Sequence, residues 1–198
     1  MIKTKIYIIF LMLSLACGSP SLSPADYVHW VENRDNGLIY SKKVGLFEYS
    51  ILYKPVEYIA IKELGKEEIN QKRIEGKLKE LKDLQYFTLK IKADEGNDLL
   101  KAGITEEAEY YDRLNYISGF MADDIKLIEG KDTLVCRLYN MERNYGLAPY
   151  NNIVLAFDAK ENNNQDKQIE INDKGFGVGK MILRIKKEDI ENIPQLKL

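Results

Sequence analysis

The sequence contains very little of the side-chain chemistry on which common enzyme classes depend. Its 198 residues include one histidine and two cysteines. A zinc site needs several His or Cys ligands. A Ser–His–Asp or Cys–His site would have to use His29, which lies beside Trp30 in an aromatic stretch. We therefore predict no catalytic residue, no metal site and no cofactor from local motifs.

Charge of one sign is not concentrated anywhere along the chain. The 29 Lys and Arg residues are balanced by 31 Asp and Glu residues, which gives a formal net charge of −2. Nucleic-acid binding requires a basic face, and no segment gathers Lys and Arg without nearby acids. We expect no nucleic-acid partner and no attachment to anionic lipid by overall charge.

The apolar run at residues 6–16 is too short to cross a bilayer as a helix, which takes about 20 residues. It follows Lys3 and Lys5 and ends in small residues. This arrangement is typical of a secretory signal, and we predict a signal peptide over residues 1–16. The alternative is a buried helix, but the run has no polar face.

The end of this run resembles the lipobox of bacterial lipoprotein precursors. The residues are LSLAC at 13–17, in which Ser14 replaces the more usual Leu. The resemblance implies that Cys17 becomes the first mature residue and carries a diacylglycerol, which would attach the protein to a membrane. Gly18 in place of Asp favours the outer membrane over the inner membrane. Residues 17–25, rich in Ser and Pro, predict an extended lipidated tether.

The second cysteine, Cys136, has two interpretations. If Cys17 is acylated, Cys136 has no partner and is expected to be a small buried hydrophobe on a strand. The alternative is a Cys17–Cys136 disulfide in a secreted protein without a lipid.

Alternation and helical periodicity predict the secondary structure. We predict strands in these ranges: 26–32, 46–54, 86–94, 125–129, 133–140, 151–159, 167–173 and 180–187. We predict helices over 56–64, 66–84 and 104–121, and one helical turn after residue 188. Residues 26–198 should therefore form a single α+β domain: a mainly antiparallel sheet or partly open sandwich with two to three helices in the middle of the chain.

Three local patterns resemble functional motifs, but each has a simpler structural explanation. GFGVGK at 175–180 lacks the spacing of a phosphate loop and precedes a strand, so we predict a turn or bulge. Asp158, Glu161 and Asp166 could form a loose calcium site, but the sequence around them lacks the order of an EF-hand, and we expect a solvated loop. The acidic pairs at 106–107 and 123–124 fit a helix start and a turn.

The first third of the body is rich in aromatic residues, among them Tyr27, Trp30 and Tyr40. If these three side chains face outward, they offer a binding surface for sugar rings or for a partner protein. The alternative is a core face with an amphipathic rim.

The sequence leaves two function classes open. The first is a non-enzymatic binding or scaffold protein of a bacterial cell envelope, anchored through acylated Cys17, with an envelope protein or a glycan as partner. The stretches YVHWVENRDNGL and ILYKPVEYIA resemble uncharacterised lipoproteins of Bacteroidota, which implies an envelope location and no ligand. The alternative is a lipid-anchored hydrolase or glycan-processing enzyme whose carboxylate pair, about 5 to 10 Å apart, is assembled by the fold.

Overall fold

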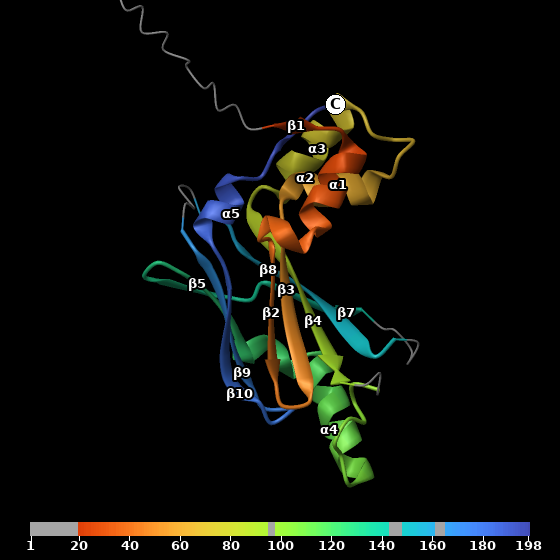
Figure 1. The fold of residues 1–198 in the computed structure, drawn as a ribbon, viewed down its shortest axis with the longest axis vertical. Helices are drawn as coiled ribbons and strands as arrows, with labels where there is room; N and C mark the ends of the chain where they lie inside the picture. The colour runs from red at the N-terminus through yellow and green to blue at the C-terminus, as the bar shows by residue number, and fades with distance from the viewer. Residues whose placement is uncertain (1–19, 95–97, 143–147, 161–164) are drawn as a thin grey trace, which may run out of the picture.

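Two antiparallel sheets and a group of helices make up the part of the chain that the computed structural model describes, residues 20–94, 98–142, 148–160 and 165–198 (Figure 1). These ranges contain five α-helices and eleven strands. The predicted α+β class and the single domain are confirmed. The antiparallel sheets remain open rather than closing into a barrel.

The larger sheet has five strands in the order β2-β3-β4-β8-β7, all antiparallel. Its strands are β2 (Ile39–Val44), β3 (Phe47–Lys54), β4 (Leu84–Ala93), β8 (Tyr150–Asp158) and β7 (Leu138–Glu142). In β3 and β4 the predicted alternation is confirmed, because Tyr49, Ile51, Leu89 and Ile91 are fully buried.

The smaller sheet has four strands in the order β10-β9-β5-β6 and packs against one face of the larger sheet. Its strands are β5 (Ile125–Glu129), β6 (Asp132–Val135), β9 (Lys167–Asp173) and β10 (Gly179–Ile185). The core between the sheets contains Phe87 and Leu155 from one side and Leu127 and Ile169 from the other. The domain is thus a partly open sandwich.

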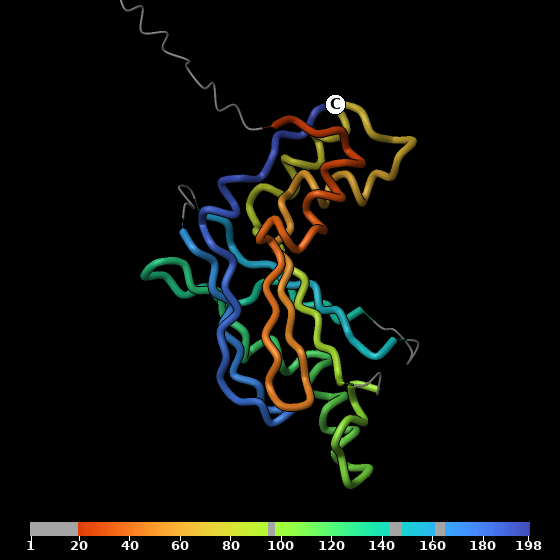
Figure 2. The backbone as a smooth tube through the Cα atoms, viewed as in Figure 1, coloured from red at the N-terminus to blue at the C-terminus, as the bar shows by residue number. Residues whose placement is uncertain are grey.

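Three helices form a group at one end of the sandwich, which we call the helical cap (Figure 1). They are α1 (Pro24–Glu32), α2 (Val56–Leu64) and α3 (Gln71–Leu81). The short strands β1 (Ser21–Leu22) and β11 (Gln195–Leu196) pair in parallel beside the cap, which brings the beginning and the end of the described chain together (Figure 2). The helix α4 (Glu107–Ser118) lies at the opposite end of the molecule (Figure 1).

The remaining elements are short. They are the 3-10 helices η1 (Arg34–Asn36) and η3 (Phe120–Asp124) and the single helical turn α5 (Lys187–Glu191). The structure confirms the predicted helix at 56–64 as α2 and most of the one at 104–121 as α4. The helix predicted at 66–84 is shorter than expected, because α3 begins at Gln71. The Asn70 side chain caps it by accepting the Arg73 N–H at 3.1 Å. A further helix lies near the start of the described chain, because residues 24–32 form α1 where a strand was predicted, and α5 matches the predicted helical turn after residue 188.

The prediction of a strand at residues 26–32 is wrong, because this segment is the helix α1. Ser23 caps it by accepting the Asp26 N–H at 3.3 Å, and Pro24 occupies the first turn, where its missing N–H costs nothing. Tyr27 and Val31 then fall on the same helical face and are fully buried. The aromatic-rich segment fits both the period of a strand and the period of a helix, and its cap residues Ser23 and Pro24 favour the helix.

The predicted tether at 17–25 is too long. The segment from Ser21 to Leu22 is the strand β1, and α1 begins at Pro24. The Pro20 carbonyl accepts the Gln195 N–H at 3.0 Å, so residues 20–25 belong to the folded domain. The rest of the predicted tether, with Cys17 and the predicted signal peptide at 1–16, lies outside the described residues.

The strand predicted over 133–140 is divided between the two sheets. β6 belongs to the smaller sheet and β7 to the larger one, and the chain crosses between them at Cys136 and Arg137. Cys136 is a free thiol that is half-buried rather than buried, and its Sγ lies 3.0 Å from the Leu138 carbonyl oxygen. Burial raises the pKa of this thiol, which lowers its reactivity.

Candidate functional site

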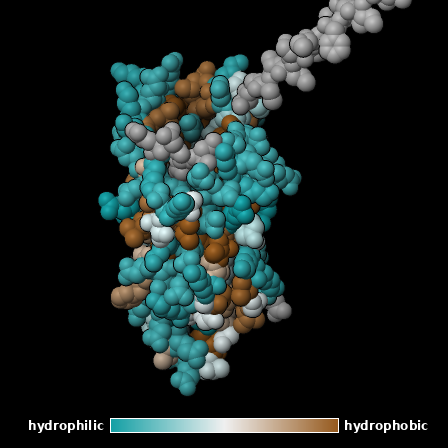
Figure 3. Space-filling model, turned by 90° about the vertical axis from the view of Figure 1, so that its left-hand side faces the viewer, coloured by the Kyte–Doolittle hydropathy of each residue, from teal (hydrophilic) through white to brown (hydrophobic). Residues whose placement is uncertain are grey.

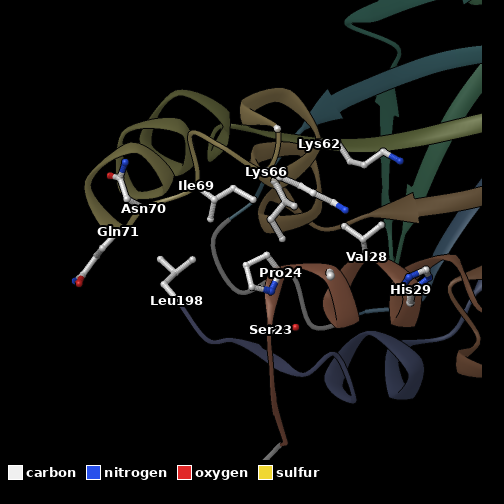
Figure 4. A pocket seen from close by; sticks show the side chains of 13 residues that line it. Ser23, Pro24, Val28, His29, Lys62, Lys66, Ile69, Asn70, Gln71 and Leu198 are labelled. Carbon is white, nitrogen blue, oxygen red and sulfur yellow. The ribbon is translucent and has the colours of Figure 1, made fainter.

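A groove of about 950 Å³ opens in the helical cap, between the N-terminal end of α1, the C-terminal end of α2 and the segment that joins α2 to α3 (Figure 4). Its volume lies within the range of small-molecule sites, about 300–1,000 Å³. Six apolar residues line it: Pro24, Ala25, Val28, Ile61, Ile69 and Leu198. In Figure 4 the side chains of Pro24, Ile69 and Leu198 converge on the hollow.

Local sequence signals shape the walls of this groove. Gly65 has a φ of +68°, a conformation that a residue with a Cβ rarely adopts, and its N–H bonds the Ile61 carbonyl at 3.2 Å. α2 therefore ends at this point, and the chain continues through Lys66 and Ile69 along the groove. Apolar side chains also gather at the cap end on the face drawn in Figure 3.

The charged side chains on the described lining of the groove are basic. Lys62 and Lys66 line it, whereas no Asp or Glu does. Lys62 Nζ forms an ion pair at 3.2 Å with Glu32, whose carboxylate also accepts a hydrogen bond from Tyr58 at 2.7 Å. Burial alone would raise the pKa of Glu32, but the hydrogen bonds from Tyr58 and Lys62 outweigh it and hold this pKa below its usual value.

The aromatic residues predicted as a binding surface do not form one. Tyr27 is fully buried in the core, so its assignment to the surface is wrong. Trp30 is half-buried on α1, and Tyr40 is 42% exposed on the edge strand β2. The helical period of α1 turns Tyr27 inward. His29 is exposed on α1 and lines the groove.

Two acid pairs, neither of them singled out from the sequence, line other depressions of the described surface. Glu109 and Asp112, three residues apart on α4, line a depression of about 480 Å³ that also includes Tyr116. Glu57 and Glu75 line one of about 640 Å³ between the cap and the final residues. The first pair has helical i,i+3 spacing, which a search for helical faces could have found.

The glycine-rich segment at 175–180 forms the loop between β9 and β10, and the predicted turn is confirmed. The carboxylate of Asp173 holds this loop, because it accepts the Phe176 N–H at 2.7 Å. The same carboxylate accepts a hydrogen bond from the Tyr49 hydroxyl at 2.6 Å. Burial raises the pKa of Asp173, and these hydrogen bonds oppose the rise. An anion of the protein itself therefore occupies the position at which a phosphate loop would hold its ligand.

Gly175 of this loop lies against the ring of Tyr116, where an added Cβ would approach to 2.2 Å. We expect Gly175→Ala to lower the free energy of unfolding by about 1–3 kcal/mol, because the loop and ring must separate. Gly76→Ala on α3 is the matched control, since its Cβ meets no atom within 4 Å, and it should stabilise the helix by about 1 kcal/mol. Urea unfolding of both variants measures the difference. Equal stabilities would contradict the close contact.

Two of the three residues considered for calcium pair with arginines. Asp158 pairs with Arg137 at 3.2 Å, Asp166 pairs with Arg184, and Glu161 lies outside the described residues. Within residues 20–94, 98–142, 148–160 and 165–198, no cluster of three or more His, Cys, Asp or Glu side chains could hold a metal ion. In the same ranges no helix has the length and apolar character needed to span a membrane.

Comparisons with protein-family models, with curated proteins and with solved structures found no match to this chain.

Proposed function

We propose that this protein is a non-enzymatic binding module of the bacterial cell envelope, held at a membrane by acylated Cys17 and binding through the groove of the helical cap. The observation that carries the proposal is the apolar floor of that groove, which is open at the surface and is lined by residues from three separate parts of the chain. The lipobox-like residues 13–17 support the anchor.

The groove favours an apolar or amphipathic partner over a glycan. Sugar rings are usually bound by exposed aromatic faces, and no Tyr, Trp or Phe occurs on the described lining of the groove. Contiguous apolar surface rimmed by polar residues is typical of sites for apolar ligands or protein segments. An envelope protein or a lipid is therefore the partner that this chemistry supports.

A second candidate function rests on Glu109 and Asp112. Glu109 and Asp112 line the same depression as Tyr116, and they are the carboxylate pair on which the lipid-anchored hydrolase or glycan-processing enzyme would depend. Both side chains are accessible, and Glu109 is hydrogen-bonded to Thr105 at 3.1 Å. Hydrolysis of an envelope glycan that is lost in both Glu109→Gln and Asp112→Asn would replace the binding proposal with this one.

The anchor has a direct test in the cell. Each buried methylene contributes about 0.8 kcal/mol, and stable anchoring takes two acyl chains or a second signal. We expect the native protein to be recovered in the membrane fraction with a diacylglycerol mass on Cys17. We expect Cys17→Ala to be folded, to lack that mass and to be recovered in the soluble fraction. An unmodified Cys17, or membrane recovery of Cys17→Ala after a high-salt wash, would overturn this anchor.

The groove is tested by photocrosslinking in intact cells. A benzophenone side chain replaces Ala25, which is exposed and lines the groove, or Tyr111, which is 54% exposed on α4 at the opposite end of the molecule. We expect crosslinked adducts from position 25 and few from position 111. Equal adduct yields at the two positions would overturn the groove as the binding surface.

A further inference from the structure

We infer that the groove of the helical cap receives an acyl chain of an anionic membrane phospholipid, whose phosphate group lies against Lys62 and Lys66. The inference rests on the proposed function, because it specifies the partner of the same groove. Three properties of the groove support this inference: its lining, its charge and its distance to the predicted anchor.

The lining separates into an apolar part and a basic part. Ile69, Leu198 and Pro24 converge on the hollow in Figure 4, and Val28 follows Pro24 one turn later on α1. Lys62 and Lys66, four residues apart, stand at the C-terminal end of α2, where their charges are also favourable for that helix. An amphipathic molecule with a hydrocarbon tail and an anionic head matches both parts.

Further features of the groove favour a negatively charged head. Asn70 and Gln71 place the N-terminal end of α3 on the lining, and the first turn of α3 carries no acidic residue. The partial positive charge of this helix end adds to that of Lys66. Acidic residues occur next to the lining, among them Asp26, Glu32, the partner of Lys62, and Glu68, the partner of Arg73, but none of these three lines the groove.

The groove also lies close to the position of the predicted anchor. Cys17 is three Cα-to-Cα steps from Pro20, and a chain spans at most about 3.6 Å per step, so the two Cα atoms are within about 11 Å of each other. Ser23, Pro24 and Ala25 follow directly and line the groove. If Cys17 is acylated, the bilayer is therefore within reach of the cap, while α4 lies at the far end of the molecule (Figure 1).

Tryptophan fluorescence tests the inference, because Trp30 is the only tryptophan of the chain. In the mature full-length protein, Trp30→Phe is combined with Ala25→Trp in the groove or with Tyr111→Trp as the matched control. Each protein is reconstituted in phosphatidylcholine vesicles that contain increasing amounts of phosphatidylglycerol with brominated acyl chains, which quench nearby tryptophan. We expect quenching at position 25 and none above background at position 111.

The role of the lysines is measured in the same vesicles. We expect Lys62→Gln and Lys66→Gln each to lower the apparent affinity for brominated phosphatidylglycerol by about fivefold, the effect of one basic side chain at an anionic surface. Lys101→Gln, an exposed position that does not line the groove, should leave it unchanged. An unchanged affinity in both groove variants would overturn the phosphate contact.

The outcomes separate this inference from the proposed function. Quenching at position 25 that is no greater than at position 111 would overturn lipid binding by the groove. If the benzophenone at position 25 nevertheless yields a protein adduct in cells, the binding module stands with a protein partner. Mass spectrometry tests the anchor independently of these experiments: if Cys17 carries no acyl mass, the proposed anchor is wrong.

Discussion

The protein is expected to unfold cooperatively between about pH 10 and 12, the range in which ordinary tyrosines ionise. Six tyrosines have strongly raised pKa values in the folded state, in each case chiefly because burial disfavours the phenolate: Tyr27, Tyr49, Tyr53, Tyr58, Tyr116 and Tyr139. The pKa of Tyr53 rises to about 12. Carboxylates reinforce the effect at Tyr49, through Asp173, and at Tyr58, through Glu32.

The direction of this effect follows from the protons bound in each state. Above about pH 10 the unfolded tyrosines lose their protons while the folded ones keep them, so stability falls as the pH rises. The full contribution is present below pH 10. Each such tyrosine lowers the free energy of unfolding by up to about 1.4 kcal/mol per pH unit, so six lower it by up to about 8 kcal/mol per pH unit. A typical protein has a total stability of about 5–15 kcal/mol.

Two lysines act in the opposite direction. Burial lowers the pKa values of Lys54 and Lys167 in the folded state, so their contribution makes the protein more stable as the pH rises toward the ordinary lysine value. Two lysines cannot offset six tyrosines in the same range. The net result is alkaline unfolding.

Circular dichroism and tyrosinate absorbance, recorded on the same samples, measure this transition. The part of the tyrosinate absorbance that comes from the six buried tyrosines should share its midpoint with the circular dichroism change, because their ionisation requires unfolding. Tyrosines at the surface contribute to the absorbance separately. Tyr27→Phe is the matched variant: the Tyr27 hydroxyl is buried and has no hydrogen-bond partner among the described residues, so the variant should fold and move the midpoint to higher pH. Tyrosinate absorbance that reaches the full value for all tyrosines while the circular dichroism stays native would contradict the burial of these rings.

Lys167→Met should lower the free energy of unfolding at neutral pH by about 3–5 kcal/mol, the cost of leaving a buried charge without its partner. Lys167 on β9 and Glu129 on β5 form an ion pair at 2.5 Å, with only 1% and 3% of their side chains exposed. The second carboxylate oxygen of Glu129 has no hydrogen-bond partner in the described structure. Removal of the ammonium therefore leaves the carboxylate buried with neither water nor a donor.

The double variant Glu129→Leu with Lys167→Met separates the cost of the unpaired charge from the value of the pair. We expect it to be clearly more stable than Lys167→Met, because an apolar pair of similar size removes both desolvation costs. Lys180→Met breaks the exposed pair with Glu170 and should cost about 0–1 kcal/mol. Urea unfolding measures all three. A double variant as unstable as Lys167→Met would show that the loss comes from packing.

Both buried polar pairs have a clear position in the fold but no strong signal in the sequence. Glu129 and Lys167 sit at the ends of two strands that alternate like their neighbours, and Asp173 precedes a turn. Their burial depends on the larger sheet covering the smaller one: Tyr53 lies over Lys167 and Tyr49 over Asp173. Sequence periodicity within one strand does not contain this information.

Local patterns in the sequence are enough to predict the α+β class, most of the strands, the helices at 56–64 and 104–121 in outline, part of the helix expected at 66–84, and the turn at the glycine-rich loop. Period, caps and turn residues act over a few positions, so they are legible locally. The helix at 24–32 has its own local signals in Ser23 and Pro24. The tertiary structure alone shows that Tyr27 is buried and that residues 133–140 divide between two sheets. It also decided where the groove lies, because residues 23–29, 61–71 and 198 become neighbours only when the two ends of the chain pair beside the cap.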